Sequence, residues 1–238
     1  EAPGASPERV HPKNGHASST PTTDGQRVYA YLGNHGLLAV DLAGNTVWHR
    51  DFGQIMASHG TAGSPLLYRD RVIVYQDMRD GTEGSFIAAF DAATGRELWR
   101  TARQENTGWG TPIAVRVGDR DEIVVSSQYR VVAYHPDTGV ELWSVSGNLF
   151  EVIPTPVVGN GLIYASSGRA GPTLAIRLCG GAAATETHVQ WSSPKGSPFV
   201  PSTLVHDGAL FMVNDMTSVL TVYDARSGQV RVQRRLGP

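Results

Sequence analysis

Short runs in which apolar and polar residues alternate recur along the chain, separated by glycine, proline, aspartate or asparagine. One stretch shows the pattern clearly, with runs at 64–68, 71–75, 86–90 and 97–100. These runs are short and rich in β-branched and aromatic residues, which favours strands over helices. We therefore predict an all-β chain in which this stretch forms four short antiparallel strands.

A longer repeat is superimposed on this alternation. Segments 39–48, 89–99 and 133–143 each run from an alanine, through a polar turn with a glycine, to a tryptophan. A fainter copy, 222–232, ends in valine, and another, 174–191, is interrupted by an insertion rich in glycine and alanine. The copies end at positions 48, 99, 143, 191 and 232. Spacings of this size, each covering four strands, are typical of the blades of a β-propeller.

The repeat divides the chain into five predicted blades. Prolines 21, 65, 112 and 156 stand near the start of each predicted first strand, where a missing N–H costs no ladder hydrogen bond. Residues 1–19 contain few large apolar side chains and are interpreted as a leader or linker, so the propeller covers 20–238. The predicted blades are 20–67, 64–109, 110–153, 154–198 and 199–237.

The repeated residues have structural roles in this interpretation. An aspartate can accept hydrogen bonds from the backbone of its own turn, and glycine can adopt the positive φ of a bulged hairpin. A tryptophan on the fourth strand can fill the space between neighbouring blades, where its indole N–H needs an acceptor. The residues assigned to these roles are Asp41, Asp91, Gly44, Gly95, Gly139, Gly228, Trp48, Trp99, Trp143 and Trp191.

The Ala-x-Asp-x-x-Thr-Gly-x-x-x-Trp pattern, as at 89–99, resembles the tryptophan-docking repeat of the pyrroloquinoline quinone (PQQ) propeller superfamily. That superfamily includes PQQ-dependent alcohol dehydrogenases and the lipoprotein of the outer-membrane β-barrel assembly machinery, which binds no quinone. The resemblance covers roughly residues 14–237 and implies an extracytoplasmic β-propeller of seven or eight blades. It indicates the fold strongly and the function weakly, because one scaffold carries many kinds of site.

Five blades are fewer than such a ring requires. The face of one blade covers roughly 300 Å², from four strands and about five residues per strand. Leaving a face of that size bare forfeits roughly 7–8 kcal/mol of apolar burial. We therefore expect further blades or self-association to cover the two ends.

Composition removes several classes of function. The chain has 20 basic and 22 acidic residues, which gives no electrostatic reason to expect nucleic acid or an anionic membrane surface as a partner. No apolar run approaches the length of a transmembrane helix. Cys179 is the single cysteine, so the chain can form neither an internal disulfide nor a thiolate zinc site. The histidines of the chain are scattered and lack paired carboxylates, so we expect no metal site.

The resemblance leaves two functions open. The PQQ dehydrogenases commonly cap the quinone with two adjacent cysteines and hold calcium with Glu, Asn and Asp, and neither set has a match in this sequence. Asp119, Asp121 and Glu122 are placed in a solvated hairpin turn, and we assign no catalytic residue. We expect a non-enzymatic scaffold that binds a protein or small ligand and needs no cofactor. The alternative is a PQQ-dependent dehydrogenase, or a fragment of one, with PQQ and calcium.

One positional pattern suggests a binding site. Large aromatic and imidazole side chains precede the predicted first strands, at one mouth of the propeller channel: His16, His59, Trp109, Phe150 and Phe199. Such groups suit recognition of a peptide, sugar or ring-shaped ligand. Asp77, Arg177 and Asp215 are expected to add polar contacts. The other interpretation is that these side chains plug the channel and satisfy loop carbonyls.

Overall fold

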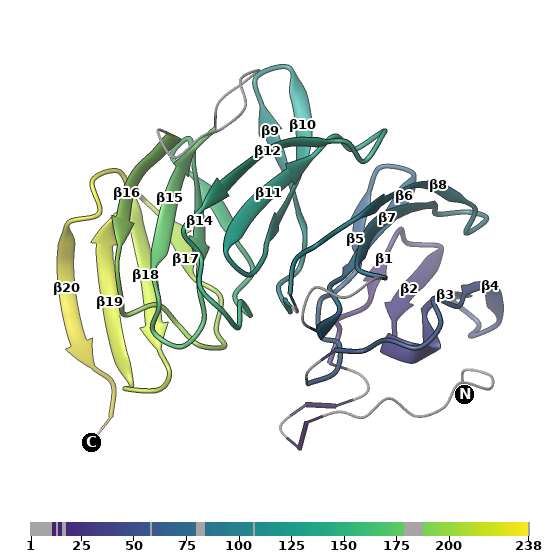
Figure 1. Ribbon diagram of the computed structural model, residues 1–238, viewed down its shortest axis with the longest axis horizontal. Helices are drawn as coiled ribbons and strands as arrows, with labels where there is room; N and C mark the ends of the chain where they lie inside the picture. The colour runs from purple at the N-terminus through teal and green to yellow at the C-terminus, as the bar shows by residue number, and fades with distance from the viewer. Residues whose placement is uncertain are drawn as a thin grey trace. The chain divides into compact units, whose positions relative to one another are not determined.

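The computed structural model describes residues 11–12, 14–15, 18–57, 59–79, 84–106, 108–178 and 188–237. These residues form β-strands and connecting loops, with a short 3-10 helix, η1 (Gly33–His35), in a strand-connecting loop, which confirms the all-β prediction (Figure 1). The chain divides into two compact units. Unit 1 is Glu1–Thr107 with Asp137–Gly139, and unit 2 is Gly108–Pro136 with Val140–Pro238.

Every sheet has four antiparallel strands that are hydrogen-bonded in chain order, and we number the sheets as blades 1 to 5. Blade 1 consists of β1 (Thr22–Thr23), β2 (Arg27–Tyr31), β3 (Leu37–Asp41) and β4 (Thr46–Arg50). Blade 2 consists of β5 (Leu66–Tyr68), β6 (Arg71–Gln76), β7 (Phe86–Asp91) and β8 (Glu97–Ala102). These strands match the runs predicted between 64 and 100 to within two residues.

Blades 3 to 5 repeat the same order. Blade 3 consists of β9 (Ile113–Val117), β10 (Arg120–Ser126), β11 (Arg130–Tyr134) and β12 (Glu141–Ser146). Blade 4 consists of β13 (Val157–Gly159), β14 (Leu162–Ser166), β15 (Thr173–Arg177) and β16 (Val189–Ser193). Blade 5 consists of β17 (Leu204–His206), β18 (Ala209–Asn214), β19 (Val219–Asp224) and β20 (Val230–Arg235). Cys179 and the rest of the insertion lie outside the described residues.

The prolines mark the start of the first strands. Pro21, Pro65, Pro112 and Pro156 each directly precede the first strand of a blade, namely β1, β5, β9 and β13. A proline in this place ends the preceding loop without removing a donor from the ladder.

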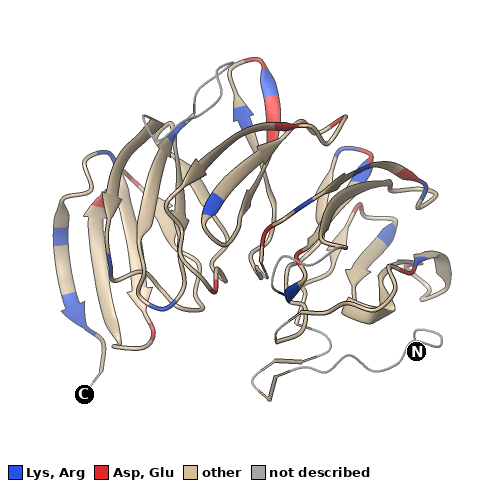
Figure 2. Ribbon diagram, viewed as in Figure 1, with Lys and Arg blue, Asp and Glu red and all other residues tan. Residues whose placement is uncertain are grey.

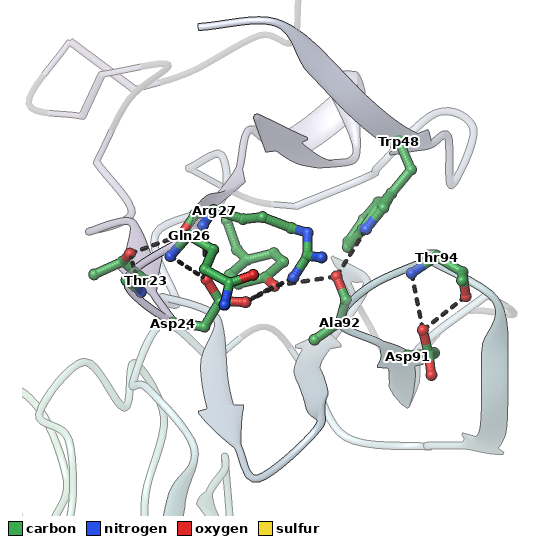
Figure 3. A network of polar contacts seen from close by, with 10 residues as sticks. Thr23, Asp24, Gln26, Arg27, Trp48, Asp91, Ala92 and Thr94 are labelled. Carbon is green, nitrogen blue, oxygen red and sulfur yellow. Dashed lines mark hydrogen bonds and ion pairs between the residues drawn. The ribbon is translucent and has the colours of Figure 1, made fainter. Parts of the chain in front are cut away.

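In unit 1, the core lies between blades 1 and 2. It is formed by Trp48 and Tyr29 from blade 1 and by Val72, Val74 and Phe90 from blade 2, all less than 10% exposed. The Ala92 carbonyl of blade 2 accepts hydrogen bonds from Trp48 Nε1 at 2.9 Å and Tyr29 Oη at 3.1 Å (Figure 3). Two blade 1 side chains therefore converge on one turn of blade 2.

The turn that carries Ala92 needs glycine. Gly95 has φ +68°, and a Cβ there would lie 2.5 Å from the ring of Trp48. Asp91 begins this turn, and its Oδ1 accepts from the Thr94 N–H at 2.8 Å and the Thr94 hydroxyl at 2.7 Å (Figure 3). These hydrogen bonds lower the pKa of Asp91. The turn is thus shaped by its own side chains and closed by the indole of the preceding blade.

Blades 4 and 5 of unit 2 meet in the same way. The Ala225 carbonyl accepts from Trp191 Nε1 at 2.9 Å and from Tyr164 Oη at 3.0 Å. A Cβ on Gly228, which has φ +72°, would lie 2.6 Å from the ring of Trp191. The chain therefore builds the same joint at least twice, once in each unit.

Trp143 of blade 3 uses a different acceptor. Its Nε1 donates to Glu122 Oε2 at 2.6 Å within the same sheet. Glu122 is 0% exposed and pairs with Arg120 at 2.7 Å. The expectation that Glu122 lies in a solvated turn was wrong, because the residue belongs to β10 and its side chain reaches under the tryptophan.

Candidate functional site

The loops at one end of unit 2 form the candidate site. In a four-stranded antiparallel sheet, the loop after the second strand and the loop after the fourth strand leave from the same end. In unit 2 these loops are 127–129, 147–156, 167–172, 194–203 and 215–218, which we call the mouth loops.

Buried hydrogen bonds connect the mouth loops of all three blades. Asn148 Nδ2 donates to Ser126 Oγ at 3.0 Å and to the Ser127 carbonyl at 2.9 Å. The Ser197 hydroxyl donates to the Ser167 carbonyl, and Asn214 Nδ2 donates to the Ser197 carbonyl at 3.2 Å. All of these residues are less than 10% exposed. A satisfied network in a dry environment holds its members rigidly, so the loops are fixed from below.

Large apolar side chains lie exposed on the same loops. They are Tyr129 (56% exposed), Leu149 (44%), Phe150 (51%), Val200 (53%) and Met216 (59%), and together we call them the mouth surface. Single exposed apolar side chains are ordinary, but several on connected loops mark an interaction site.

Backbone contacts bring these loops side by side. The Tyr129 N–H donates to the Leu149 carbonyl at 3.5 Å, and the Leu149 N–H donates to Ser167 Oγ at 2.9 Å. On the other side, the Phe199 N–H donates to Asp215 Oδ1 at 2.8 Å. Asp215 therefore joins the loop that carries Val200 to the loop that carries Met216.

An ion pair bridges the two halves of the mouth surface. Arg169 pairs with Glu151, which raises the pKa of the arginine, and its guanidinium lies 5.2 Å from the ring centroid of Phe199. Both members of the pair have positive φ, 52° for Arg169 and 58° for Glu151. Non-glycine residues in this conformation cost roughly 1–3 kcal/mol each and cluster at functional sites. The pair contributes no net charge to the mouth surface.

Unit 1 contains a buried ionic cluster at the ends of β6 and β8. Arg103 Nε lies 2.6 Å from Asp77 Oδ1, and Arg103 Nη2 lies 3.6 Å from Glu105 Oε2. The side chains of Arg103 and Asp77 are 0% exposed, and the guanidinium lies 5.2 Å from the ring centroid of Tyr75. A carboxylate paired in this way inside the protein acts as a structural anchor for its loop.

The residues predicted to line the mouth fall in different places. His16 lies outside the described residues. His59 belongs to unit 1, where its ring packs edge-on to His11 at 4.9 Å and its carbonyl accepts from Asn14 Nδ2 at 2.8 Å. Trp109 belongs to unit 2, is 9% exposed, and donates its backbone N–H to the Val152 carbonyl at 2.9 Å.

The three polar residues predicted for the mouth also lie in different places. Asp215 is exposed on a mouth loop of unit 2, whereas Asp77 is buried in the cluster with Arg103 in unit 1. Arg177 pairs in register with Leu162 at the end of β15 away from the mouth loops, and its Nε donates to Gln190 Oε1 at 3.1 Å. The position of Arg177 at that far end means that it does not join the mouth surface.

Sequence reasoning singled out Asp77 and Asp215 but missed the other residues that hold the loops. A signal was present, because second strands end in polar pairs where the alternation predicts an apolar residue. These pairs are Gln76-Asp77, Ser126-Ser127, Ser166-Ser167 and Asn214-Asp215. Their partners Asn148, Ser197 and Arg103 lie in loops or directly after a strand, and nothing in the local sequence distinguishes them.

A calcium-dependent quinone site would need a cluster of carboxylates with free oxygen ligands. Within the described part of the chain, no group of three or more His, Cys, Asp or Glu residues is arranged to hold a metal ion. Among the described residues of unit 1, the buried carboxylates are Asp77 and Glu105, and both face the Arg103 guanidinium. This donor set does not fit a divalent cation. Across the described ranges no helix is long and apolar enough to cross a membrane.

Four-stranded antiparallel blades, joined by tryptophan–turn contacts, define a β-propeller of the quinoprotein-like class. A family model described as outer membrane protein assembly factor BamB matches residues 9–84 and 83–237, and the chain belongs to this family. No curated protein sequence matches the chain.

Solved structures show the same fold. BamB from Moraxella catarrhalis aligns with a TM-score of 0.66 and 16% identity, covering 88% of this chain and 58% of that one. A europium-containing methanol dehydrogenase aligns with a TM-score of 0.60 and 17% identity, covering 92% of this chain and 50% of that one. The quinohemoprotein alcohol dehydrogenase from Comamonas testosteroni aligns with a TM-score of 0.64 and 14% identity, covering 92% of this chain and 43% of that one. The chain thus spans about half the length of these structures.

Proposed function

We propose that the chain is a non-enzymatic propeller scaffold that binds a protein partner through the mouth surface of unit 2. The observation that carries this proposal is the set of exposed apolar side chains on loops that are cross-linked by buried hydrogen bonds. The name of the family, an outer membrane protein assembly factor, supports a role in protein assembly outside the cytoplasm.

The physical argument rests on preorganisation. Binding costs less when the contacting side chains are already ordered in the free protein. Phe150 and Met216 lie on loops that the buried hydrogen bonds of Asn148 and Asn214 anchor, so they expose apolar area without a large ordering cost. An aromatic and a methionine side chain are also among the types enriched at interfaces between proteins.

Site-specific photocrosslinking in a cell-envelope fraction tests the proposal. A crosslinking amino acid is placed at Phe150, at Val200 or at Met216, and at Val140 as an equally exposed control (59%) away from the mouth loops. We expect one protein adduct from the three mouth positions and none from Val140. The partner identified in the adduct is then titrated against Phe150→Asp, which should weaken binding at least tenfold. Equal labelling at all four positions would contradict the proposal.

The dehydrogenase neighbours define the second candidate. The same protein is incubated with PQQ and calcium chloride and assayed for dye reduction with alcohols and sugars. We expect no turnover above that of free PQQ. Activity that depends on both additions would replace the scaffold assignment with a quinoprotein oxidoreductase.

A further inference from the structure

Tyr129 stands at a place in the fold where glycine is the usual residue. It is the last residue of the three-residue loop between β10 and β11, and its φ is +72°. In hairpin loops of this length, the residue before the returning strand commonly adopts the left-handed conformation, which glycine reaches without strain. In blade 1 the residue directly before β3 is Gly36, with φ +71°. Tyr129 therefore combines the backbone conformation of a glycine with an aromatic side chain.

Hydrogen bonds on both sides hold the Tyr129 backbone in this conformation. Its N–H donates to the Leu149 carbonyl at 3.5 Å, and its carbonyl accepts from the Gly147 N–H at 3.0 Å. The Ser127 N–H closes the loop by donating to the Arg130 carbonyl at 3.0 Å. A strained conformation persists only where the surrounding structure enforces it, and these contacts enforce it at Tyr129.

The Tyr129 side chain makes no contact that compensates for this strain. It is 56% exposed, and among the described residues its ring has no aromatic or cationic partner and its hydroxyl has no hydrogen-bond partner. Other large residues with positive φ do have such partners. The Arg69 guanidinium lies 4.9 Å from the ring centroid of Tyr68, and Arg169 pairs with Glu151.

The charge next to Tyr129 is held along the sheet. The basic residue at the start of β11, drawn as a blue band in Figure 2, is Arg130. Its Nη1 donates to Glu141 Oε1 at 2.9 Å and to Ser144 Oγ at 3.2 Å, and both acceptors belong to β12. The guanidinium is thus occupied within blade 3. The exposed ring of Tyr129 therefore lies beside the loop that carries Phe150 without a free charge attached to its own loop.

From these observations we propose that Tyr129 is the anchor of the mouth surface, the side chain that the protein partner buries in an apolar recess. The inference rests on the proposed function and names the residue that determines its specificity. Tyrosine has a large rigid apolar body and is among the residues that dominate the binding energy of interfaces. A strained, exposed side chain that no contact within the chain explains is accounted for by a contact outside it.

This role separates two properties of position 129. The stability of the chain depends on whether the residue tolerates a positive φ, whereas binding of the partner depends on the ring. Tyr129→Gly removes both the ring and the strain, Tyr129→Ala removes the ring alone, and Tyr129→Phe keeps both. The three variants therefore distinguish an anchor from a residue that only shapes its loop.

Circular dichroism melting measures the strain. Tyr129→Gly should melt roughly 2–4 °C above Tyr129→Ala, because glycine adopts this conformation freely and alanine does not. Tyr129→Ala and Tyr129→Phe should melt within about 2 °C of the wild type, since both keep an L residue at positive φ. Asp207→Gly is a control for the substitution by glycine. Asp207 has φ +44°, and its 89% exposed side chain lies in the β17–β18 turn, at the end of blade 5 away from the mouth loops.

Photocrosslinking measures the binding. A crosslinking amino acid at Val200, which lies on a different mouth loop from Tyr129, reports capture of the partner in a cell-envelope fraction. Tyr129→Ala and Tyr129→Gly should each lower the yield of the adduct at least fivefold, and Tyr129→Phe should recover most of what Tyr129→Ala loses. Asp207→Gly should leave the yield unchanged.

The outcomes separate this inference from the proposed function. A wild-type adduct whose yield stays the same in Tyr129→Ala and Tyr129→Gly would overturn the role of Tyr129 while the proposed function stands. Equal melting temperatures of these two variants would show that position 129 is not strained, and the inference would fail on that ground. No adduct from any mouth position of the wild type would overturn the proposed function and the role of Tyr129 together.

Discussion

At the scale of single residues, one carbonyl oxygen does much to fix blade 1 against blade 2. The Ala92 carbonyl accepts from Trp48 and Tyr29, and the neighbouring Gly95 leaves room for the indole ring. The turn sequence is thus constrained twice, by its own backbone conformation and by the side chain that covers it. The same pair of constraints applies to Gly228 under Trp191.

A substitution at Gly95 is expected to break this joint. Gly95→Ala places a Cβ 2.5 Å from the Trp48 ring at φ +68°, so steric and conformational strain add to roughly 3 kcal/mol or more of lost stability. Gly25→Ala is the control, because Gly25 has φ +85° but no atom within 4 Å of its Cβ position. Gly25→Ala should cost only roughly 1–2 kcal/mol, the penalty of an L residue in the left-handed conformation. Urea denaturation measures both, and equal losses would contradict the prediction.

Among single residues, Asp24 makes the stability of the folded chain depend on pH (Figure 3). Burial raises its pKa, but hydrogen bonds from the Tyr29 hydroxyl, the backbone N–H groups of Gln26 and Arg27, and the Arg27 guanidinium outweigh burial. The net effect lowers the pKa from 3.8 to about 2. The folded form therefore binds the proton less tightly than the unfolded form.

The contribution of Asp24 should be present above pH 4 and disappear as the pH falls from about 4 to about 2. Asp24→Asn should lower stability at pH 7 by about 1 kcal/mol, since an amide accepts these hydrogen bonds less strongly. The difference between wild type and variant should vanish near pH 2, as measured by urea titration at each pH. A difference that persists at pH 2 would show that charge is not the cause.

At the scale of elements, the ionic cluster of unit 1 ties the end of β6 to the end of β8. Arg103 faces both Asp77 and Glu105, and its side chain is fully buried. In unit 2 the ends of the strands are joined by the neutral side chains of Asn148, Ser197 and Asn214, so no charged group takes part in these contacts. The two units therefore hold their loops by different chemistry.

Loss of the guanidinium should be costly because it strands two buried carboxylates. Arg103→Met is expected to destabilise the chain by about 3–5 kcal/mol. Arg100→Met is the matched control, in the strand β8 that directly precedes Arg103, since Arg100 and its partner Glu97 are 37% and 42% exposed in their side chains. Its effect should stay below about 1 kcal/mol. Thermal unfolding measures the loss of stability in both variants. A small loss in Arg103→Met would mean that the carboxylates are stabilised by other groups.

At the scale of the whole molecule, the outer faces of blades 1 and 5 carry exposed apolar side chains. Both are made mainly of aliphatic side chains, with Leu42 and Val232 more than half exposed. Apolar contact of this kind is strengthened by ions that are excluded from protein surfaces, whereas contact between charges is weakened by salt.

The solubility of the chain should therefore fall more steeply in sodium sulfate than in sodium chloride. The measurement is the protein concentration that stays in solution as each salt is added. Leu42→Gln combined with Val232→Gln should keep more protein in solution in sulfate, because it reduces the exposed apolar area of both faces without changing the net charge. Equal solubility of wild type and variant in sulfate would contradict the prediction.

The sequence predicted the fold because the signals for strands and turns lie in residues that are close together in the chain. Alternation over four or five residues predicted β5 to β8, and prolines 21, 65, 112 and 156 marked the first strands. The sequence predicted the candidate site less well than the fold. His59 and Trp109 were chosen for their position before a strand, but Trp109 is 9% exposed, and the exposed side chains Leu149 and Met216 were passed over. Exposure depends on which distant segment covers a residue, and sequence position does not reveal this.

By itself, the sequence determined that this chain forms successive four-stranded blades, because hydrophobic periodicity and turn chemistry act between residues close in the chain. Only the tertiary structure decided what each polar or aromatic side chain does. It buried Glu122 beneath Trp143 and Asp77 against Arg103, and it left Leu42 and Val232 bare. Such outcomes depend on partners far along the chain, and a partner is defined by packing and distance.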